Sequence, residues 1–505
     1  MDLSGAEMGF LETEDRRQGA ILAIAWVCFT TMILLVVHHH APWSDEAQAW
    51  LIARDNSLFE MLFRRLHYEG TPGLWHVLLW PLARFGAPYR TMSYLSALLA
   101  SVSAGLILIF APFPVWLRVL FVFGYYPAYQ YAVVARSYCL NVLLMVLAAT
   151  LYSTRDSKPL RYCLILAALA NTNLFGFLVA GVLFAEFTLM AWRSRWALTK
   201  RFGIPASFFV IASLLAVAQA APARDVLIAG YDDAIRRSVI ATTQIARAFV
   251  EFGPPIDNGF TMPIVLSAGI LAVGLGLAAK AKKLALMIFV CGAPLAFQAV
   301  KYSPWLAGLI YLSWVFGVWI SWPALSKLSA RYRRAVVLMV ASLFVLHAYD
   351  ALAAWRLDLS HPYSAGPQAA MFLKNSFAAN PNLKLAFVGY EAIAVQPYFN
   401  QNVFANYYGG APKPSYYDWK LGQPCPYRSN AQYVAELMRT GEFDSVLVSE
   451  RSLVSPEYEP VARQAGYFQV RSFEGERVWK DDIYFLDDLL VFEKCATPLP
   501  RPSAK

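Results

Sequence analysis

Long apolar segments without charge recur along the first two thirds of the chain. Residues 20–37 contain no charged side chain over 18 positions and follow Arg16 and Arg17. At about 1.5 Å per residue, a helix of this length crosses a hydrocarbon core of about 30 Å. The segment has no small-residue cleavage site after it, and we therefore expect a permanent first span rather than a cleaved signal peptide.

Ten further apolar segments predict ten more spans, which gives eleven in all. They lie at 92–111, 119–135, 137–152, 162–175, 177–192, 203–221, 262–279, 284–300, 305–322 and 335–354. The apolar stretch 74–85 is too short to cross a bilayer. We expect it to lie in the membrane interface, with Trp75, His76 and Trp80 at the level of the lipid headgroups.

Basic residues alternate between the predicted loops. One set of loops is rich in Lys and Arg, whereas the alternate loops contain few, chiefly Arg136 and Lys301. The positive-inside rule then places the N-terminus and the basic loops on the cytoplasmic side of the membrane. We expect this membrane to be the plasma membrane, which in a bacterium is the inner membrane. A long first outer loop, 38–91, follows from this orientation. The basic loops lie near 118, 155–161, 193–201, 280–283 and 327–334.

The sequence changes character after residue 354, where Asn, Pro and Tyr become frequent. Short runs typical of β-strands alternate here with helical stretches, a pattern that predicts a soluble α/β domain over 355–505. By span parity this domain lies outside the membrane, on the periplasmic side of a bacterial cell. The predicted strands are 383–390, 444–450, 468–473 and 488–494, and the predicted helices are 367–377 and 431–439.

Composition agrees with a polytopic α-helical membrane protein over 1–354 and the soluble domain beyond it. Hydrophobic residues make up 58% and charged residues only 15%, against about 25% charged in soluble proteins. The net charge of +9 is explained by the basic loops, so no nucleic-acid partner is expected. In the soluble domain, a bridge between Cys425 and Cys495 and two free thiols are equally weighted alternatives.

Metal and cofactor chemistry has little support in the sequence. The six cysteines form no C-x-x-C pair, which argues against a zinc ribbon or an iron–sulfur site. His38, His39 and His40 are adjacent and cannot all face one ion, so an interfacial polar patch is the favoured interpretation. We therefore predict no cofactor and no metal site, with a divalent metal kept as an open alternative.

The strongest candidate for chemistry is the acidic pair Asp45 and Glu46, just beyond the first span. Two adjacent carboxylates beside Trp43 and Trp50 are costly to desolvate unless they are paired or used. This favours a catalytic role for both. The alternative, compatible with the first, is a helix that starts at Ser44 and Asp45, with Glu46 interacting favourably with its dipole.

Three polar residues flank a turn in the segment HYEGTPGLWH, residues 67–76. His67, Glu69 and His76 are candidate substrate-binding residues, although Gly and Pro prescribe a turn there by themselves. Glu186, inside the sixth predicted span, is a further candidate, because an acid inside the membrane is costly and usually has a function.

Two cations stand on the outer side, where the charge bias disfavours them. Arg136 lies in the segment ARSYCL, with Tyr138 close by, and Lys301 is followed by Tyr302. A lipid headgroup is one partner for such cations, and a substrate phosphate or pyrophosphate clamped between them is the other.

The order of these features in residues 1–354 resembles the membrane-integral GT-C glycosyltransferases. The features are the Asp-Glu pair, a Pro-containing turn before an in-plane helix, the Ala-Arg-x-Tyr-x-Leu segment and a late Lys-Tyr before a Pro. The nearest members are the protein O-mannosyltransferases and the aminoarabinose and galacturonic-acid transferases that use polyprenyl-phosphate sugars. The resemblance implies that Asp45 is the catalytic carboxylate, that Arg136 is the second-loop arginine, and that Lys301 and Tyr302 hold the lipid phosphate.

One departure from this family concerns the acid that many relatives carry after the arginine, where this chain has only Asn141. The expected activity is inverting transfer of a sugar from a polyprenyl-phosphate donor to a glycan, lipid or protein acceptor. Attack by the acceptor itself needs one carboxylate as base and cations for the departing phosphate. The alternative is a carrier or flippase of lipid-linked saccharides, which would need polar groups near the membrane midplane. A membrane-anchored binding module is weaker, since one span would suffice.

Overall fold

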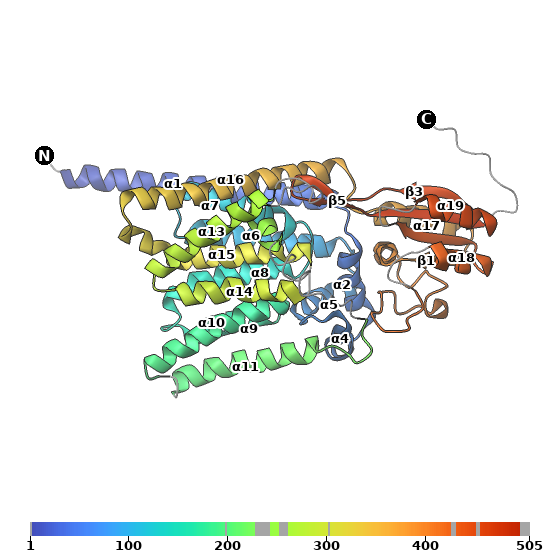
Figure 1. Cartoon of the computed structure of the whole chain (residues 1–505), viewed down its shortest axis with the longest axis horizontal. Helices are drawn as coiled ribbons and strands as arrows, with labels where there is room; N and C mark the ends of the chain where they lie inside the picture. Colours follow the sequence, from blue (N-terminus) through green and yellow to red (C-terminus); the bar gives the residue numbers. More distant parts are fainter. Residues whose placement is uncertain are drawn as a thin grey trace.

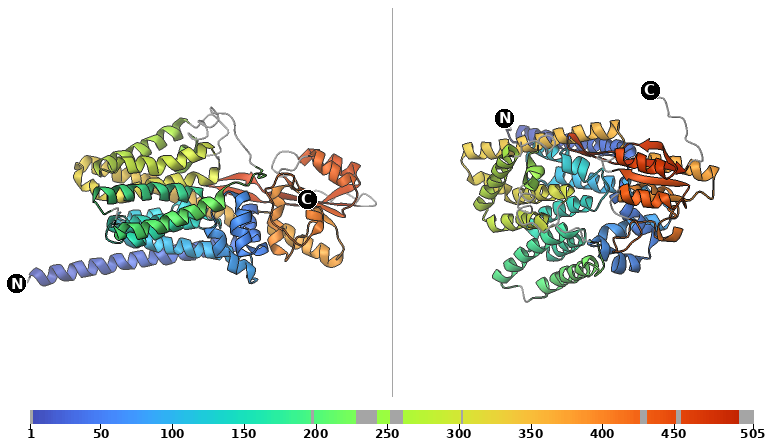
Figure 2. Two further views of the ribbon diagram at one scale, coloured as in Figure 1. Left: turned by 90° about the horizontal axis from the view of Figure 1, so that it is seen from below. Right: turned by 45° about the vertical axis from the view of Figure 1, so that its right-hand side comes forward.

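The computed structural model describes residues 3–196, 199–227, 243–251, 261–300, 303–425, 431–450 and 455–494. Two parts are visible in Figure 1: a bundle of helices that run roughly side by side, and a smaller region with a sheet at one end of it. The first outer loop, with α2, α4 and α5, lies between these parts. The N-terminus lies at the far end of the bundle from the sheet (Figures 1 and 2).

Seven helices in the described part of the chain are long and apolar enough to cross a membrane. They are α1 (Leu3–His39), α6 (Thr91–Phe110), α10 (Leu174–Arg193), α11 (Lys200–Ala220), α13 (Thr261–Lys280), α15 (Ala307–Ser321, continued by a 3₁₀-helix Trp322–Lys327) and α16 (Ala330–Ser360). Three shorter apolar helices join them: α8 (Tyr138–Leu151), α9 (Pro159–Ala170) and α14 (Leu284–Val300). Large apolar side chains such as Leu98, Leu214 and Phe289 are exposed on the outside of the bundle, which suits contact with lipid. The chain is therefore a helical membrane protein, as its sequence predicts.

The predicted span at 119–135 is wrong as a single helix. Helix α7 (Val115–Val122) ends at Phe123, a π-helical turn spans Tyr126–Gln130, and irregular backbone follows to Ser137. Gly124 favours an end to the helix, and Pro127 has no N–H to continue it. The segment nevertheless connects the two ends of the bundle. The guanidinium of Arg118 donates to Leu108 O at one end (2.8 Å), and Arg136 contacts Asp45 at the other.

The first outer loop is almost entirely helical. It contains α2 (Ser44–Asp55), α3 (Leu58–Glu60), a π-helical turn (Met61–Arg65), α4 (Leu66–Glu69) and α5 (Leu74–Arg84). Gly70 ends α4 with a φ of 60°, a conformation that costs glycine nothing. Helix α5 packs against α2, and this packing buries Trp75 and His76. The expectation that these two side chains lie among lipid headgroups is therefore wrong.

The C-terminal region forms a four-stranded sheet in the order β1-β2-β6-β3. Its strands are β1 (Leu385–Val388), β2 (Ser445–Glu450), β3 (Tyr467–Phe473) and β6 (Asp488–Lys494), with helices α17 (Gly366–Ala379), α18 (Ala431–Arg439) and α19 (Ser455–Gln464). Strands β1 and β2 are parallel and the other pairs antiparallel. All four predicted runs contain a strand of this sheet. Cys425 is buried, and Cys495 lies outside the described residues.

A β-hairpin that the sequence analysis did not predict connects this region to the helix bundle. It consists of β4 (Glu476–Trp479) and β5 (Asp482–Leu486). The indole of Trp479 packs against Tyr125 and donates to Glu251 Oε2 (2.7 Å). The ammonium of Lys480 lies 3.7 Å from the Asp350 carboxylate on α16. These buried polar contacts attach the C-terminal region to the bundle.

The loop 38–91 and the C-terminal region meet at one end of the bundle. There, the guanidinium of Arg54 donates to Phe399 O (2.6 Å). At the other end, Arg155 and Lys283 lie against the same ring, that of Tyr152. The carboxylate of Glu186 is 3.0 Å from Arg155, so this acid has a structural partner. The two groups of loops predicted to face opposite sides of the membrane thus lie at opposite ends of the bundle.

Candidate functional site

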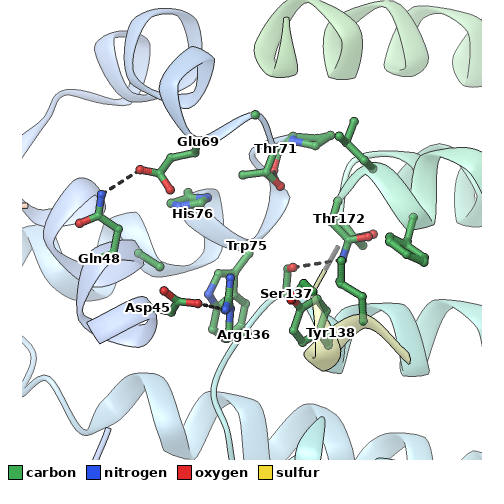
Figure 3. A pocket seen from close by; sticks show the side chains of 18 of the residues that line it. Asp45, Gln48, Glu69, Thr71, Trp75, His76, Arg136, Ser137, Tyr138 and Thr172 are labelled. Carbon is green, nitrogen blue, oxygen red and sulfur yellow. Dashed lines mark hydrogen bonds and ion pairs between the residues drawn. The ribbon is translucent and has the colours of Figure 1, made fainter. Parts of the chain in front are cut away.

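A cavity of about 220 Å³ lies at the end of the bundle where the first outer loop meets the C-terminal region. Its walls come from α2, from the turn after α4, from the segment before α8 and from the turn between α9 and α10. Figure 3 shows the polar side chains that project into it. Five residues predicted from the sequence line this cavity: Asp45, Glu69, His76, Arg136 and Tyr138.

The Asp45 carboxylate is held by two partners from distant parts of the chain. Its Oδ2 forms an ion pair with Arg136, and its Oδ1 accepts a hydrogen bond from the Tyr390 hydroxyl (2.9 Å). Helix α2 does start at Ser44, as the alternative interpretation predicts. The carboxylate of Asp45 is bonded to these two side chains, however, and it faces the cavity (Figure 3).

Glu46 is buried beside Asp45 and does not line the cavity. Its carboxylate accepts hydrogen bonds from the backbone N–H of Trp43 (3.1 Å) and of Ala135 (2.7 Å). Adjacent helical residues point about 100° apart, which separates the two acids. Glu46 thus fixes the start of α2 and holds the segment that leads to Arg136. The structure therefore does not bring the two predicted catalytic acids together in the cavity.

A buried ion-pair network lies behind Glu46. His40 Nε2 is 3.2 Å from the Glu46 carboxylate, and His40 Nδ1 is 2.8 Å from that of Asp358 on α16. Burial lowers the pKa of His40, but the two carboxylates outweigh it and raise the pKa to about 10. His40 is therefore a buried cation at neutral pH, not part of an interfacial patch as predicted, although His38 and His39 are exposed.

Arg136 supplies the positive charge of the cavity. Burial disfavours its charged form, but the neighbouring Asp45 carboxylate more than compensates and raises the pKa of Arg136. The guanidinium lies over the rings of Trp43 and Tyr138, at 5.9 and 5.3 Å from their centroids. Aromatic faces stabilise a cation in this position. An anion that enters the cavity must share Arg136 with Asp45 or displace it.

His76 adds a neutral hydrogen-bonding group to the cavity. Burial, and then the charge of Arg136, lower the pKa of His76 to about 4. Its Nδ1 is buried and has no hydrogen-bond partner among the described residues, an arrangement that costs free energy until a ligand satisfies it. Beside it, Glu69 accepts a hydrogen bond from Gln48 Nε2 (2.8 Å), as drawn in Figure 3.

The remaining predicted residues lie elsewhere. His67 lines a separate groove, where its ring nitrogens face Ala221 O (2.6 Å) and Phe63 O (3.0 Å). The prediction that His67 belongs with the other site residues is therefore wrong. Lys301 and Tyr302 lie outside the described residues. The chain lines the cavity again at Ser303 and Leu306.

The C-terminal region contributes Tyr390 to the site, and this residue was not predicted from the sequence. Tyr390 begins a 3₁₀-helix (Tyr390–Tyr398) directly after β1, and the intervening Gly389 has a φ of 90°. Gln48 was also missed, and it is fixed by the backbone of Tyr417, whose N–H donates to Gln48 Oε1 (2.8 Å). A glycine that ends a buried strand is the one pattern that points to Tyr390, since ligand sites often form where strands end.

If Asp45 acts as a base on a substrate, replacing Tyr390 with Phe should lower turnover about tenfold and leave substrate affinity unchanged. The change removes one hydrogen bond to a carboxylate, worth roughly 1.5–3 kcal/mol, from a residue that positions Asp45. Steady-state kinetics with a split into kcat and KM would measure this. Tyr398→Phe is the matched control, because Tyr398 lies in the same 3₁₀-helix and its hydroxyl has no hydrogen bond to the described residues. A tenfold rise in KM at unchanged kcat would instead make Tyr390 a substrate-binding residue.

Comparison of the sequence with protein-family models and with curated proteins finds no match to either. The site must therefore be interpreted from its own groups. Among the described residues, no three His, Cys, Asp or Glu side chains are grouped as ligands for a metal ion. The cavity offers the carboxylates of Asp45 and Glu69, a cation beside Asp45 and neutral hydrogen-bonding groups, a combination suited to deprotonating a hydroxyl next to an anion.

Proposed function

We propose that the chain is an inverting glycosyltransferase of the GT-C type. It would transfer a sugar from a polyprenyl-phosphate donor to an acceptor hydroxyl at the outer face of the membrane. The observation that carries the proposal is the Asp45–Arg136 pair, which lines a cavity at the end of a membrane-spanning bundle. A base and a phosphate-binding cation are the two groups that this reaction requires.

The reaction balances with these groups alone. The acceptor oxygen forms a bond to the anomeric carbon and gives its proton to the Asp45 carboxylate. The bond between that carbon and the phosphate oxygen breaks, and the departing phosphate carries away the electron pair. Arg136 stabilises the negative charge that develops on it. Attack from the face opposite the phosphate inverts the anomeric configuration.

The contacts of Asp45 predict an order of binding. Both carboxylate oxygens have a partner, Arg136 on one side and Tyr390 on the other. A donor phosphate that draws Arg136 toward itself would free Oδ2 to accept a proton, while Tyr390 keeps the carboxylate in place. The donor would then bind first and activate the base for the acceptor.

The place of the cavity favours transfer over transport. The cavity is lined by loops and helix ends at one end of the bundle. A carrier would instead place its polar groups near the midplane.

The proposal is tested with the purified full chain in vesicles that contain polyprenyl-phosphate sugars. Lipid-linked sugars and surface glycans from cells with and without the protein identify the donor and acceptor to supply. Formation of free polyprenyl phosphate together with a glycosylated acceptor is the expected result. Movement of intact lipid-linked sugar between leaflets without bond cleavage would overturn the proposal in favour of a flippase.

Arg136→Gln should weaken donor binding roughly 10- to 100-fold, because a charge-assisted phosphate contact contributes about 1.5–3 kcal/mol. Equilibrium binding of the lipid donor to wild type and variant measures the effect. Arg84→Gln is a control with the same change of charge, since Arg84 is exposed at the end of α5 and does not line the cavity. Equal donor affinity in wild type and Arg136→Gln would assign Arg136 to the positioning of Asp45 alone.

The orientation of the chain is a further prediction. A cysteine placed at 400–410 should react with a membrane-impermeant maleimide in intact cells, and one placed at 280–283 should not. The basic loops fix this orientation, and the two segments lie at opposite ends of the bundle. The labelling uses a chain whose six native cysteines are replaced. The reverse pattern would place the cavity in the cytoplasm.

A further inference from the structure

A second depression lies beside the cavity, and we refer to it as the basic groove. Residues Glu60, Phe63–Arg65, His67 and Tyr68 line one side, and Ala221–Arg224 line the other. Its volume is about 530 Å³. Figure 1 shows α4 beside the end of α11, and these two helices pack together.

The basic groove has an excess of positive charge. Three arginines line it, Arg64, Arg65 and Arg224, against one acid, Glu60. Arg65 is 3.4 Å from the Glu60 carboxylate and also lies near Asp418 (3.8 Å). Arg64 and Arg224 are exposed and form no ion pair within the described part of the chain. Two uncompensated guanidiniums therefore face the groove or its rim.

His67 joins the two sides of the groove. Its Nδ1 lies 2.6 Å from Ala221 O and its Nε2 lies 3.0 Å from Phe63 O. The ring thus connects α4 with the segment that follows α11. The histidine predicted as a substrate ligand has a structural position in the groove instead.

The position of the groove indicates that its ligand comes from the membrane. Ile211, Leu214 and Val217 of α11 are exposed, as lipid-facing side chains are. Helix α11 ends at Ala220, and the groove begins at the next residue. Lipids packed along this face would therefore have their headgroups at the groove. Phe59, exposed on α3 next to it, can pack on the acyl boundary.

We propose that the basic groove binds the phosphate-bearing headgroup of an anionic lipid. Guanidinium groups bind phosphate oxygens in a bidentate manner, and two arginines without ion-pair partners in the described chain are available here. The inference does not rest on glycosyl transfer. It has a consequence for the cavity, because the same turn lines the groove with Tyr68 and the cavity with Glu69 and Gly70. A bound headgroup would hold this wall of the cavity in place.

Native mass spectrometry of the full chain in detergent tests the proposal. Phosphatidylglycerol and phosphatidylcholine are titrated in parallel against wild type, Arg64→Gln, Arg224→Gln and the double variant. Each arginine near a lipid phosphate contributes about 1 kcal/mol, so the double variant should bind phosphatidylglycerol about 10- to 30-fold more weakly. Arg84→Gln is the matched control, since Arg84 is exposed on the same loop but does not line the groove.

Three results would overturn the proposal. They are equal affinity of wild type and double variant for phosphatidylglycerol, equal affinity of wild type for the two lipids, and inorganic phosphate that competes as well as the lipid does. The last result would assign the groove to a soluble phosphate. If the double variant does not fold, wild type alone remains informative. Its preference for phosphatidylglycerol should fall as ionic strength rises, and a salt-independent preference would contradict a charge-based site.

Discussion

Asp45→Asn should lower sugar transfer by roughly 10²- to 10⁴-fold while donor binding persists. Asparagine keeps the shape of the side chain and still accepts the hydrogen bond from Tyr390, but it cannot take the proton of the acceptor. The loss of charge also releases Arg136 from its ion pair, so the donor phosphate should bind at least as tightly as before. Turnover and equilibrium donor binding, measured on the same preparation, separate the two effects.

The controls for this variant follow from the structure. If Asp45 only starts a helix, Asn serves nearly as well and activity should barely change. Glu436→Gln removes an exposed carboxylate on α18, far along the chain, and should leave transfer at the wild-type rate. Near-normal transfer by Asp45→Asn would mean that the base lies elsewhere, and Glu69 is the next candidate because it also lines the cavity.

The membrane portion was predictable because a spanning helix needs a long uncharged apolar segment, whether its side chains face lipid or other helices. Ten of the predicted spans correspond to apolar helices of the structure, seven of them long enough to cross a membrane. The prediction failed at 119–135, which is uncharged but contains four tyrosines and a glutamine. A hydropathy pattern takes no account of backbone hydrogen bonds, and Pro127 interrupts them.

In the C-terminal region, too, apolar segments could be predicted and polar contacts could not. Its four sheet strands show as apolar runs in the sequence, whereas the β4–β5 hairpin contains charged residues that normally indicate an exposed turn. Arg477 pairs with Asp487, and Lys480 lies near Asp350 in α16. Lys480 and Asp350 are far apart in sequence, and no local pattern reveals such a pair.

Part of the candidate site could be predicted where a charge stands in an unfavourable place. Asp45 and Arg136 were found for that reason, and the structure brings them together. Glu69 and His76 were found because they flank a turn set by Gly and Pro, and they line the same cavity.

Nothing local distinguishes Tyr390 from the other tyrosines of the C-terminal region. Nor does the sequence tell Asp45 from Glu46, because the two differ only in the side of α2 that each faces. As a result, the Asp45 carboxylate lines the cavity, whereas the Glu46 carboxylate lies in a buried ion-pair network.

The second large expected effect is a loss of stability when the buried ion-pair network around His40 is broken. His40 lies between the carboxylates of Glu46 and Asp358, at 3.2 and 2.8 Å. His40→Gln removes the charge that compensates these two buried acids. Loss of one partner from a buried ion pair costs about 3–5 kcal/mol, because the remaining charges stay desolvated. Glu46→Gln should also destabilise the fold, so a loss of activity in that variant would not identify Glu46 as a base.

A pH titration of thermal unfolding in detergent distinguishes the charge of His40 from its packing. Its pKa is raised from the ordinary 6.5 to about 10 in the folded chain. The stabilisation is therefore complete below pH 6.5 and is lost as the pH rises toward 10. Wild type should unfold at progressively lower temperature over this range, and His40→Gln should lack this component of the decline. His38→Gln, two residues away and exposed, should behave like wild type. Parallel pH profiles for wild type and His40→Gln would mean that His40 is neutral in the folded protein and contributes by packing and hydrogen bonding alone.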